Sequence, residues 1–192
     1  MGIRRLSGLF AAVAVLSVAP QGWAETPTET VKQLIESVRS YKNTNNAAAQ
    51  VRKVTEETLA VQELAQHVLG PQWGKLSARE RQDFVQLLED LVQKVAYPKS
   101  AEFFGDLQIE FTNERVNGNE AEVETVVSHP KEGLVTIGYR LRQKDGRWVI
   151  NDVLLDDVSL VTNLRTQMQQ VIAKESYQGL VKRMREKLAE ES

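Results

Sequence analysis

The stretch Arg140–Leu164, RLRQKDGRWVINDVLLDDVSLVTNL, contains the turn and the corner on which the fold depends. Asp145-Gly146 is typical of a two-residue type I′ turn, because both turn positions need a positive φ that Asp and Gly tolerate. Apolar residues alternate with polar ones on both sides of it, at 134–143 and 147–155. The stretch therefore predicts an antiparallel hairpin, followed by two aspartates and the start of a helix.

A two-residue turn also fixes the register of this hairpin, because each cross-strand pair then has the same sum of residue numbers. The face predicted to point inward carries Leu141 opposite Ile150, Tyr139 opposite Asp152, and Ile137 opposite Leu154. Tyr139 and Asp152 would form the one polar couple on an aliphatic face. A hydrogen bond that braces the sheet is the simpler interpretation, and a catalytic acid in a pocket is the alternative.

Two more strands are predicted before this hairpin. Polar and apolar residues alternate at 107–112 and at 121–127, and Asn117-Gly118 between them is a second hairpin signal. Four strands with short connections predict a four-stranded antiparallel meander sheet.

Apolar residues with a period near 3.6 predict helices before and after the sheet. A capping box, Ser77 with Glu80, begins one of them, and Pro98 is expected to limit it. The predicted helices are 25–44, 47–60, 61–69, 78–97, 158–173 and a last one from about 176. The fold class is therefore α+β, with the inner face of the sheet covered by N- and C-terminal helices.

At the corner after the last strand, Asp157 or Ser159 is expected to cap the next helix. Asp156 and Asp157 lie where a helix N-terminus favours negative charge.

The first 24 residues have the pattern of a secretory signal peptide: Arg4 and Arg5, an apolar run, Pro20, and small residues ending at Ala24. We expect cleavage after Ala24, which leaves 25–192 as a single domain. This segment carries two arginines and no acid, so its removal changes the formal net charge from −2 to −4. An exported, mildly acidic chain is a poor candidate for binding nucleic acid.

The chain has no cysteine, so an exported form has neither disulfides nor a lipid anchor on cysteine. It has no G-x-S-x-G, P-loop or G-x-G-x-x-G motif. His67 and His129 have no partner at a ligand spacing, so neither a metal site nor a cofactor is expected. These observations favour binding over catalysis.

Two segments resemble a known family. AQHVLGPQWGKLSARERQDFVQLLEDLV (65–92) is similar to the A-x-x-VLG-x-x-W-x-x-(S/T)-x-x-(Q/E)-R-x-x-F segment of the MlaC/toluene-tolerance family. RWVINDVLLDDVSLVTNLRTQMQQVI (147–172) is similar to its W-x-I-x-D-V-x-x-E-G-V-S-L-V-x-N-x-R-x-Q segment. Asp156-Asp157 replaces the usual Glu-Gly, which suggests that this corner does not need a glycine conformation.

The resemblance implies a monomeric periplasmic carrier of phospholipid, NTF2-like in outline. Such carriers exchange lipid between an outer-membrane lipoprotein complex and an inner-membrane ABC transporter with an MCE-domain subunit. The acyl chains would lie in a hydrophobic cavity between the inner face of the sheet and the helices. The residues expected to line it are Phe84, Leu87, Leu88, Leu91, Ile109, Phe111, Val123, Val127, Ile137, Tyr139, Leu141, Ile150, Leu154, Leu160, Leu164 and Met168.

Two alternatives remain open at the level of the sequence. One is a small periplasmic enzyme that uses Asp152 and Tyr139 in the same pocket. The other is an interaction module with a filled core. The basic face at 182–187 is a candidate docking surface for partners of the carrier.

Overall fold

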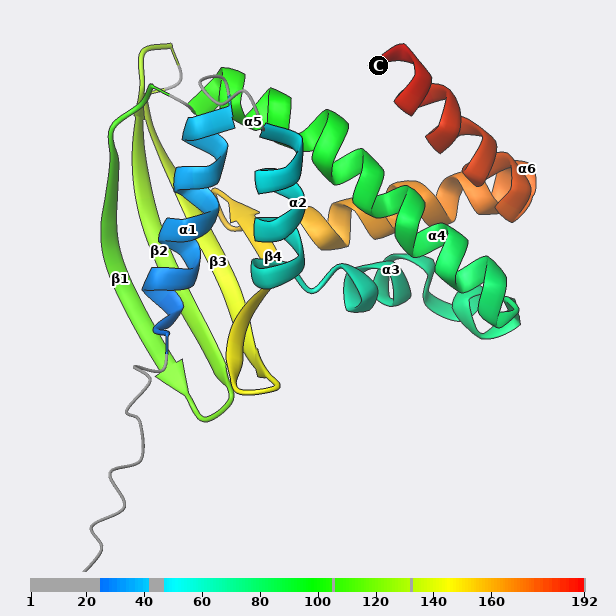
Figure 1. The fold of residues 1–192 in the computed structure, drawn as a ribbon, viewed down its shortest axis with the longest axis horizontal. Helices are drawn as coiled ribbons and strands as arrows, with labels where there is room; N and C mark the ends of the chain where they lie inside the picture. Colours follow the sequence, from blue (N-terminus) through cyan, green and yellow to red (C-terminus); the bar gives the residue numbers. More distant parts are fainter. Residues whose placement is uncertain (1–24, 42–46, 105, 132, 192) are drawn as a thin grey trace, which may run out of the picture.

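The computed structural model describes residues 25–41, 47–104, 106–131 and 133–191. The predicted signal peptide, 1–24, lies outside the described residues. A curved antiparallel sheet forms one layer, and helices from both ends of the chain lie against one of its faces (Figure 1). The α+β class predicted from the sequence is confirmed.

The predicted helices and strands occur in the predicted order. The elements are α1 (Pro27–Ser40), α2 (Ala47–Thr58), α3 (Val61–Leu69), η2 (Gly70–Lys75), α4 (Ala78–Leu91), η3 (Val92–Ala96), α5 (Tyr97–Phe104), β1 (Ile109–Asn117), β2 (Glu120–His129), β3 (Gly133–Lys144), β4 (Arg147–Leu155), β5 (Val158–Ser159) and α6 (Leu160–Glu190). Of these, α5 and β5 are additional to the predicted elements. The capping box at Ser77 is present, since the Glu80 amide donates to Ser77 Oγ and the Ser77 amide donates to the Glu80 carboxylate.

The sheet has five strands rather than the predicted four, in the order β1-β2-β3-β4-β5. The difference arises at the corner, where Asp156 and Asp157 have φ values of 45° and 65°. This left-handed turn brings Val158 opposite Leu155, so the chain makes a short strand before α6 begins. The expectation that the corner needs no glycine-like backbone was wrong; aspartate is one of the few residues that tolerate it.

Asp156 also extends the sheet after β4 has ended. Its amide donates to the Thr136 carbonyl at 3.0 Å, and its Oδ1 accepts from the Thr136 amide at 3.1 Å. Ser159, and not Asp157, caps α6, because its Oγ accepts from the Thr162 amide at 3.0 Å.

The register of the β3–β4 hairpin agrees with the prediction only near the turn. Leu141 pairs with Ile150 as predicted, but the next pair is Arg140 with Asp152, so Asn151 is an extra residue in β4. This β-bulge reverses the side on which all later residues of β4 lie. The predicted pairs Tyr139–Asp152 and Ile137–Leu154 are therefore wrong, and Val153 and Leu155 take their places opposite Tyr139 and Ile137.

The bulge lies where the link between α2 and α3 touches the sheet. Leu59 forms an isolated parallel bridge with Ile150, and the Ala60 amide donates to the Ile150 carbonyl at 3.1 Å. This backbone contact joins segments 90 residues apart in the chain. The alternation of apolar and polar residues in β4 therefore could not predict it.

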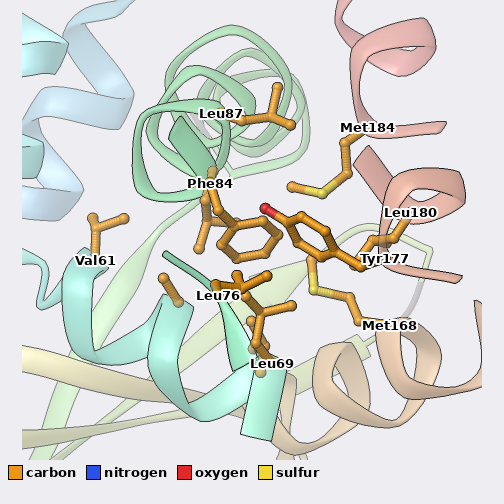
Figure 2. Close-up of a cluster of buried hydrophobic side chains, with 12 residues drawn as sticks. Val61, Leu69, Leu76, Phe84, Leu87, Met168, Tyr177, Leu180 and Met184 are labelled. Atoms are coloured by element: carbon orange, nitrogen blue, oxygen red, sulfur yellow. The ribbon is translucent and has the colours of Figure 1, made fainter. Parts of the chain in front are cut away.

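Apolar side chains form two cores. One lies on the inner face of the sheet and includes Val31, Val123, Val127, Leu141 and Ile150. The other joins α3, α4 and α6, where Phe84 packs against Tyr177 with ring centroids 6.2 Å apart (Figure 2). No helix in the described part of the chain is long and apolar enough to cross a membrane.

The second core depends on a break in α6. Ser176 has φ 73° and ψ 173°, so the helix stops and restarts, as the sequence predicted near this residue. The part after Ser176 turns back in a new direction (Figure 1). It places Tyr177, Leu180 and Met184 beside α4, as Figure 2 shows.

Candidate functional site

A cavity of about 410 Å³ lies between the inner face of the sheet and the helices that cover it. Its walls come from α1, the α2–α3 link and the start of α3, the segment from η3 to α5, strands β1, β3 and β4, and the start of α6. Aliphatic and aromatic side chains make up nearly all of the lining. A space of this size and character is typical of sites for small apolar ligands.

Six of the residues predicted to line the cavity do so: Ile109, Ile137, Tyr139, Ile150, Leu160 and Leu164. The other predicted residues lie elsewhere. Phe84, Leu87, Leu88 and Met168 belong to the core of α3, α4 and α6, with Leu91 packed against it. Val123, Val127 and Leu141 are buried in the sheet core, which Phe111 joins. Which residues contact a ligand stays a prediction.

Leu154 was predicted to lie on the inner face of the sheet, and the bulge at Asn151 places it on the outer face instead. Leu154 lies opposite Gly138, whose missing side chain leaves room for it on the outer face of the sheet. Leu155 takes the inward position and lines the cavity instead.

Sequence reasoning missed much of the lining. Most of the missed residues come from helices, whose apolar stripes give no indication of which neighbour they face, and the bulge in β4 turned Val153 and Leu155 inward. The missed apolar residues are Leu34, Ile35, Val38, Leu59, Ala60, Val61, Leu64, Val92, Ala96, Tyr97, Phe104, Val153, Leu155 and Val161. The stripe on α1 was visible in the sequence, so α1 could have been identified as a wall of the cavity.

One wall contains a π-helical turn, η3. The Tyr97 amide donates to the carbonyl of Val92, five residues back. Pro98 has no amide hydrogen, and in a regular helix its ring would clash with the carbonyl four residues earlier. The wider turn allows the helix to continue to Phe104 instead of ending before Pro98 as predicted. Val92, Ala96 and Tyr97 of this segment line the cavity.

The two tyrosines in the lining, Tyr97 and Tyr139, are uncharged. Burial raises the pKa of Tyr139, although a hydrogen bond with Thr125 acts in the opposite direction. Burial also raises the pKa of Tyr97, whose hydroxyl accepts from Ser37 Oγ at 3.2 Å. Both phenols therefore stay protonated at neutral pH.

Asp152 also lines the cavity, but its carboxylate is already satisfied. Oδ1 accepts from the Val161 amide at 3.2 Å, at the start of α6, and Oδ2 lies 3.5 Å from Arg140 Nη1. Asp152 therefore fastens α6 to β4, and its partners differ from those of the acid–tyrosine couple that the sequence suggested. The described residues contain no cluster of potential metal ligands.

The basic face at 182–187 is largely neutralised by neighbouring acids. Lys182 pairs with Glu186, Arg183 pairs with Glu175, and Lys187 pairs with Glu190 and Glu191. This arrangement is that of a solvated helix face and weakens its case as a docking surface.

Comparison with solved structures identifies a similar fold. The chain superposes on a phospholipid-binding protein from Ralstonia solanacearum, solved in complex with a phospholipid, with a TM-score of 0.68 and 16% identity over 85% of this chain and 94% of that one. At this identity the likeness shows the fold alone. An NTF2-like protein of Campylobacter jejuni gives a TM-score of 0.37 and 12% identity, over 66% of this chain and 98% of that one, which is too low to support an argument.

Among curated protein sequences, none matches this chain significantly. The model of the MlaC protein family, in contrast, matches residues 25–186, which include every element that lines the cavity. The chain therefore belongs to the MlaC family.

Proposed function

We propose that this protein is a phospholipid carrier, with acyl chains in the cavity and the headgroup at its mouth. The observation that carries the proposal is the apolar cavity of about 410 Å³ between sheet and helices. Two findings support it: the chain belongs to the MlaC family, and the R. solanacearum protein of similar fold binds phospholipid. Binding and transport thus account for the site better than catalysis does.

The energetics of an acyl chain suit a carrier. Each methylene removed from water contributes about 0.8 kcal/mol, so ten buried methylenes contribute about 8 kcal/mol. A lipid held in this way escapes slowly into water, but it passes at little net cost into another apolar site. Transfer therefore takes place within a docked complex with the donor or acceptor.

The N-terminal pattern and the family support a periplasmic location for the carrier. Residues 1–24 act as a signal peptide cleaved after Ala24, and the mature protein works in the periplasm as a monomer. There it exchanges phospholipid between an outer-membrane lipoprotein complex and an inner-membrane ABC transporter with an MCE-domain subunit, in a Mla-type system that maintains the lipid asymmetry of the outer membrane.

Two neighbouring leucines on β4 allow a sharp test. Leu155 lines the cavity, whereas Leu154 lies on the other face of the same strand. In Leu155→Trp the indole occupies space that an acyl chain needs. We expect native mass spectrometry of purified Leu155→Trp to show at least tenfold less bound phospholipid than the wild type.

Leu154→Trp is the matched control, because it introduces the same side chain one residue away and leaves the cavity open. It should carry as much phospholipid as the wild type. Circular dichroism checks that both variants are folded. If the wild type emerges without lipid and cannot be loaded from liposomes, the carrier function is wrong.

A further inference from the structure

Among the residues that the structure describes, Arg39 is the charged residue on the cavity lining that has no counter-ion. Asp152, the other charged residue there, is neutralised by Arg140 and by the Val161 amide. Within the described residues, no carboxylate forms an ion pair with Arg39. A cation on the wall of an apolar cavity is costly unless an anion or water satisfies it.

The position of Arg39 marks an opening of the cavity. Arg39, Ala96, Asn151 and Leu160 are exposed to solvent and also line the cavity, so Arg39 lies at a mouth of the cavity. Arg39 belongs to the last turn of α1, at the end of that helix which lies beside α5 (Figure 1). The aliphatic stem of Arg39 can cover the lining while its guanidinium reaches solvent.

One hydrogen bond holds the guanidinium in place. Arg39 Nη2 donates to the Leu107 carbonyl at 2.7 Å, just before β1 begins. A guanidinium has five N–H donors in a plane, and Nη2 forms a donor fork with Nη1 on one edge and with Nε on the other. The Leu107 carbonyl occupies one N–H of Nη2, so the fork that uses its second N–H can still bind an oxyanion. Two parallel hydrogen bonds from such a fork fit the two free oxygens of a phosphodiester.

We propose that Arg39 binds the phosphodiester of the cargo lipid and so selects phospholipids over uncharged lipids with the same acyl chains. This inference rests on the proposed carrier function. When acyl chains fill the cavity, they bring the phosphate to the mouth. The loss of nearby water then strengthens its attraction to the guanidinium.

The test compares two lipids with the same fluorescent acyl chain, a phosphatidylglycerol and a diacylglycerol, transferred from phosphatidylcholine vesicles to the protein. Arg39→Gln should bind the phosphatidylglycerol about tenfold more weakly than the wild type, because charge-assisted hydrogen bonds are lost. Its affinity for the diacylglycerol should not change. Arg39→Lys keeps the charge but not the fork, so its phosphatidylglycerol affinity should lie between the two.

Arg165→Gln is the matched control. Arg165 also donates from its guanidinium to a backbone carbonyl, that of His67 at 3.2 Å, but it does not line the cavity. Its loss removes the same charge and the same type of tertiary hydrogen bond, and it should leave both affinities unchanged. Inorganic phosphate at 10 mM serves as a second probe and should not displace the phosphatidylglycerol, because it has no acyl chain to anchor it.

The outcomes separate the two proposals. If the wild type takes up neither lipid, the carrier function itself is wrong. If the wild type and Arg39→Gln bind both lipids equally well, the carrier function stands and the role of Arg39 is refuted. An equal loss of both lipids in Arg39→Gln would also refute it, since that result indicates damage to the cavity. Displacement by inorganic phosphate alone would assign the site to the free anion instead of the lipid.

Discussion

Glu63 fastens α3 to the end of β3 through one carboxylate oxygen. Its Oε1 lies 2.7 Å from Arg142 Nη2 and 2.8 Å from Lys144 Nζ. Burial acts to raise the pKa of Glu63, but the hydrogen bond from Lys144 and the two positive charges outweigh it, and the pKa is lowered. Because α3 supplies Val61 and Leu64 to the cavity, this ion pair also holds one wall in place.

A lowered pKa makes this contribution depend on pH in a definite direction. The stabilisation is fully present above the unfolded-state pKa of about 4.5 and is lost as the pH falls through the lower folded-state pKa. We expect Glu63→Gln to reduce the free energy of unfolding by about 1 kcal/mol at pH 7, a value limited by solvent screening. The difference from the wild type should shrink below pH 4, as measured by urea unfolding.

Glu110→Gln, on the exposed face of β1, controls for the loss of one negative charge. A wild-type advantage over Glu63→Gln that is as large at pH 3 as at pH 7 would contradict the ion-pair explanation.

Ser159, Asp152 and Asp156 show how single polar residues position the corner beside the cavity. Each of them accepts a backbone amide hydrogen bond, from Thr162, Val161 and Thr136 respectively. These amides have no partner within their own helix or strand ladder, so the side chains replace the missing bonds. The residue types were visible in the sequence, but only the fold shows which amide each one meets.

Among the elements, α6 contains a backbone conformation that serine rarely adopts. The φ of 73° and ψ of 173° at Ser176 lie in a region that glycine occupies without steric cost. Gly179, one turn after Ser176, is also needed for the chain reversal. A Cβ at this position would lie 2.6 Å from the Glu175 Cβ, which is too close for any other residue. The break is therefore a feature of the sequence around it and not of a frayed helix.

We expect Ser176→Gly to stabilise the protein by about 1 kcal/mol, because glycine relieves the conformational strain at this position. The midpoint of urea unfolding should rise with no change in slope. Ser176→Ala retains the Cβ and should give no such gain. A Ser176→Gly protein that is less stable than Ser176→Ala would show that the strain is absent.

Strand β4 shows why the sequence predicted the strands of the sheet but not which residues of β4 point inward. The Asp145-Gly146 turn set the register correctly as far as Leu141 and Ile150. One extra residue, Asn151, then exchanged the two faces for the remainder of the strand. A bulge changes the hydrogen-bond ladder without changing the apolar pattern enough to be recognised, since Val153, Leu154 and Leu155 are all aliphatic.

In the whole molecule, the two cores perform different tasks. The core shared by α3, α4 and α6 contains Phe84, Leu87, Leu88 and Met168, which the sequence had assigned to the cavity but which do not line it (Figure 2). The sheet core is open on one side, where the cavity begins. Stability and ligand binding should therefore respond to different substitutions.

Leu88→Ala tests this division. Leu88 is 3% exposed in the core of α3, α4 and α6, so its truncation should cost about 2–4 kcal/mol of unfolding free energy. The lipid content of the folded variant should remain that of the wild type, because Leu88 does not line the cavity. Denaturant unfolding and native mass spectrometry measure the two effects separately. A loss of bound lipid in a protein that remains folded would argue against separate cores.

The sequence by itself determined the order of the predicted elements, the antiparallel meander, the helix cap at Ser77, and the family. These depend on local patterns: alternation, periodicity, turn residues and short motifs. Only the tertiary structure decided which apolar residues pack into the cores and which line the cavity. The hydrophobic effect rewards burial without specifying the partner, so Leu88 and Leu160 look alike in the sequence although one fills a core and the other lines a cavity.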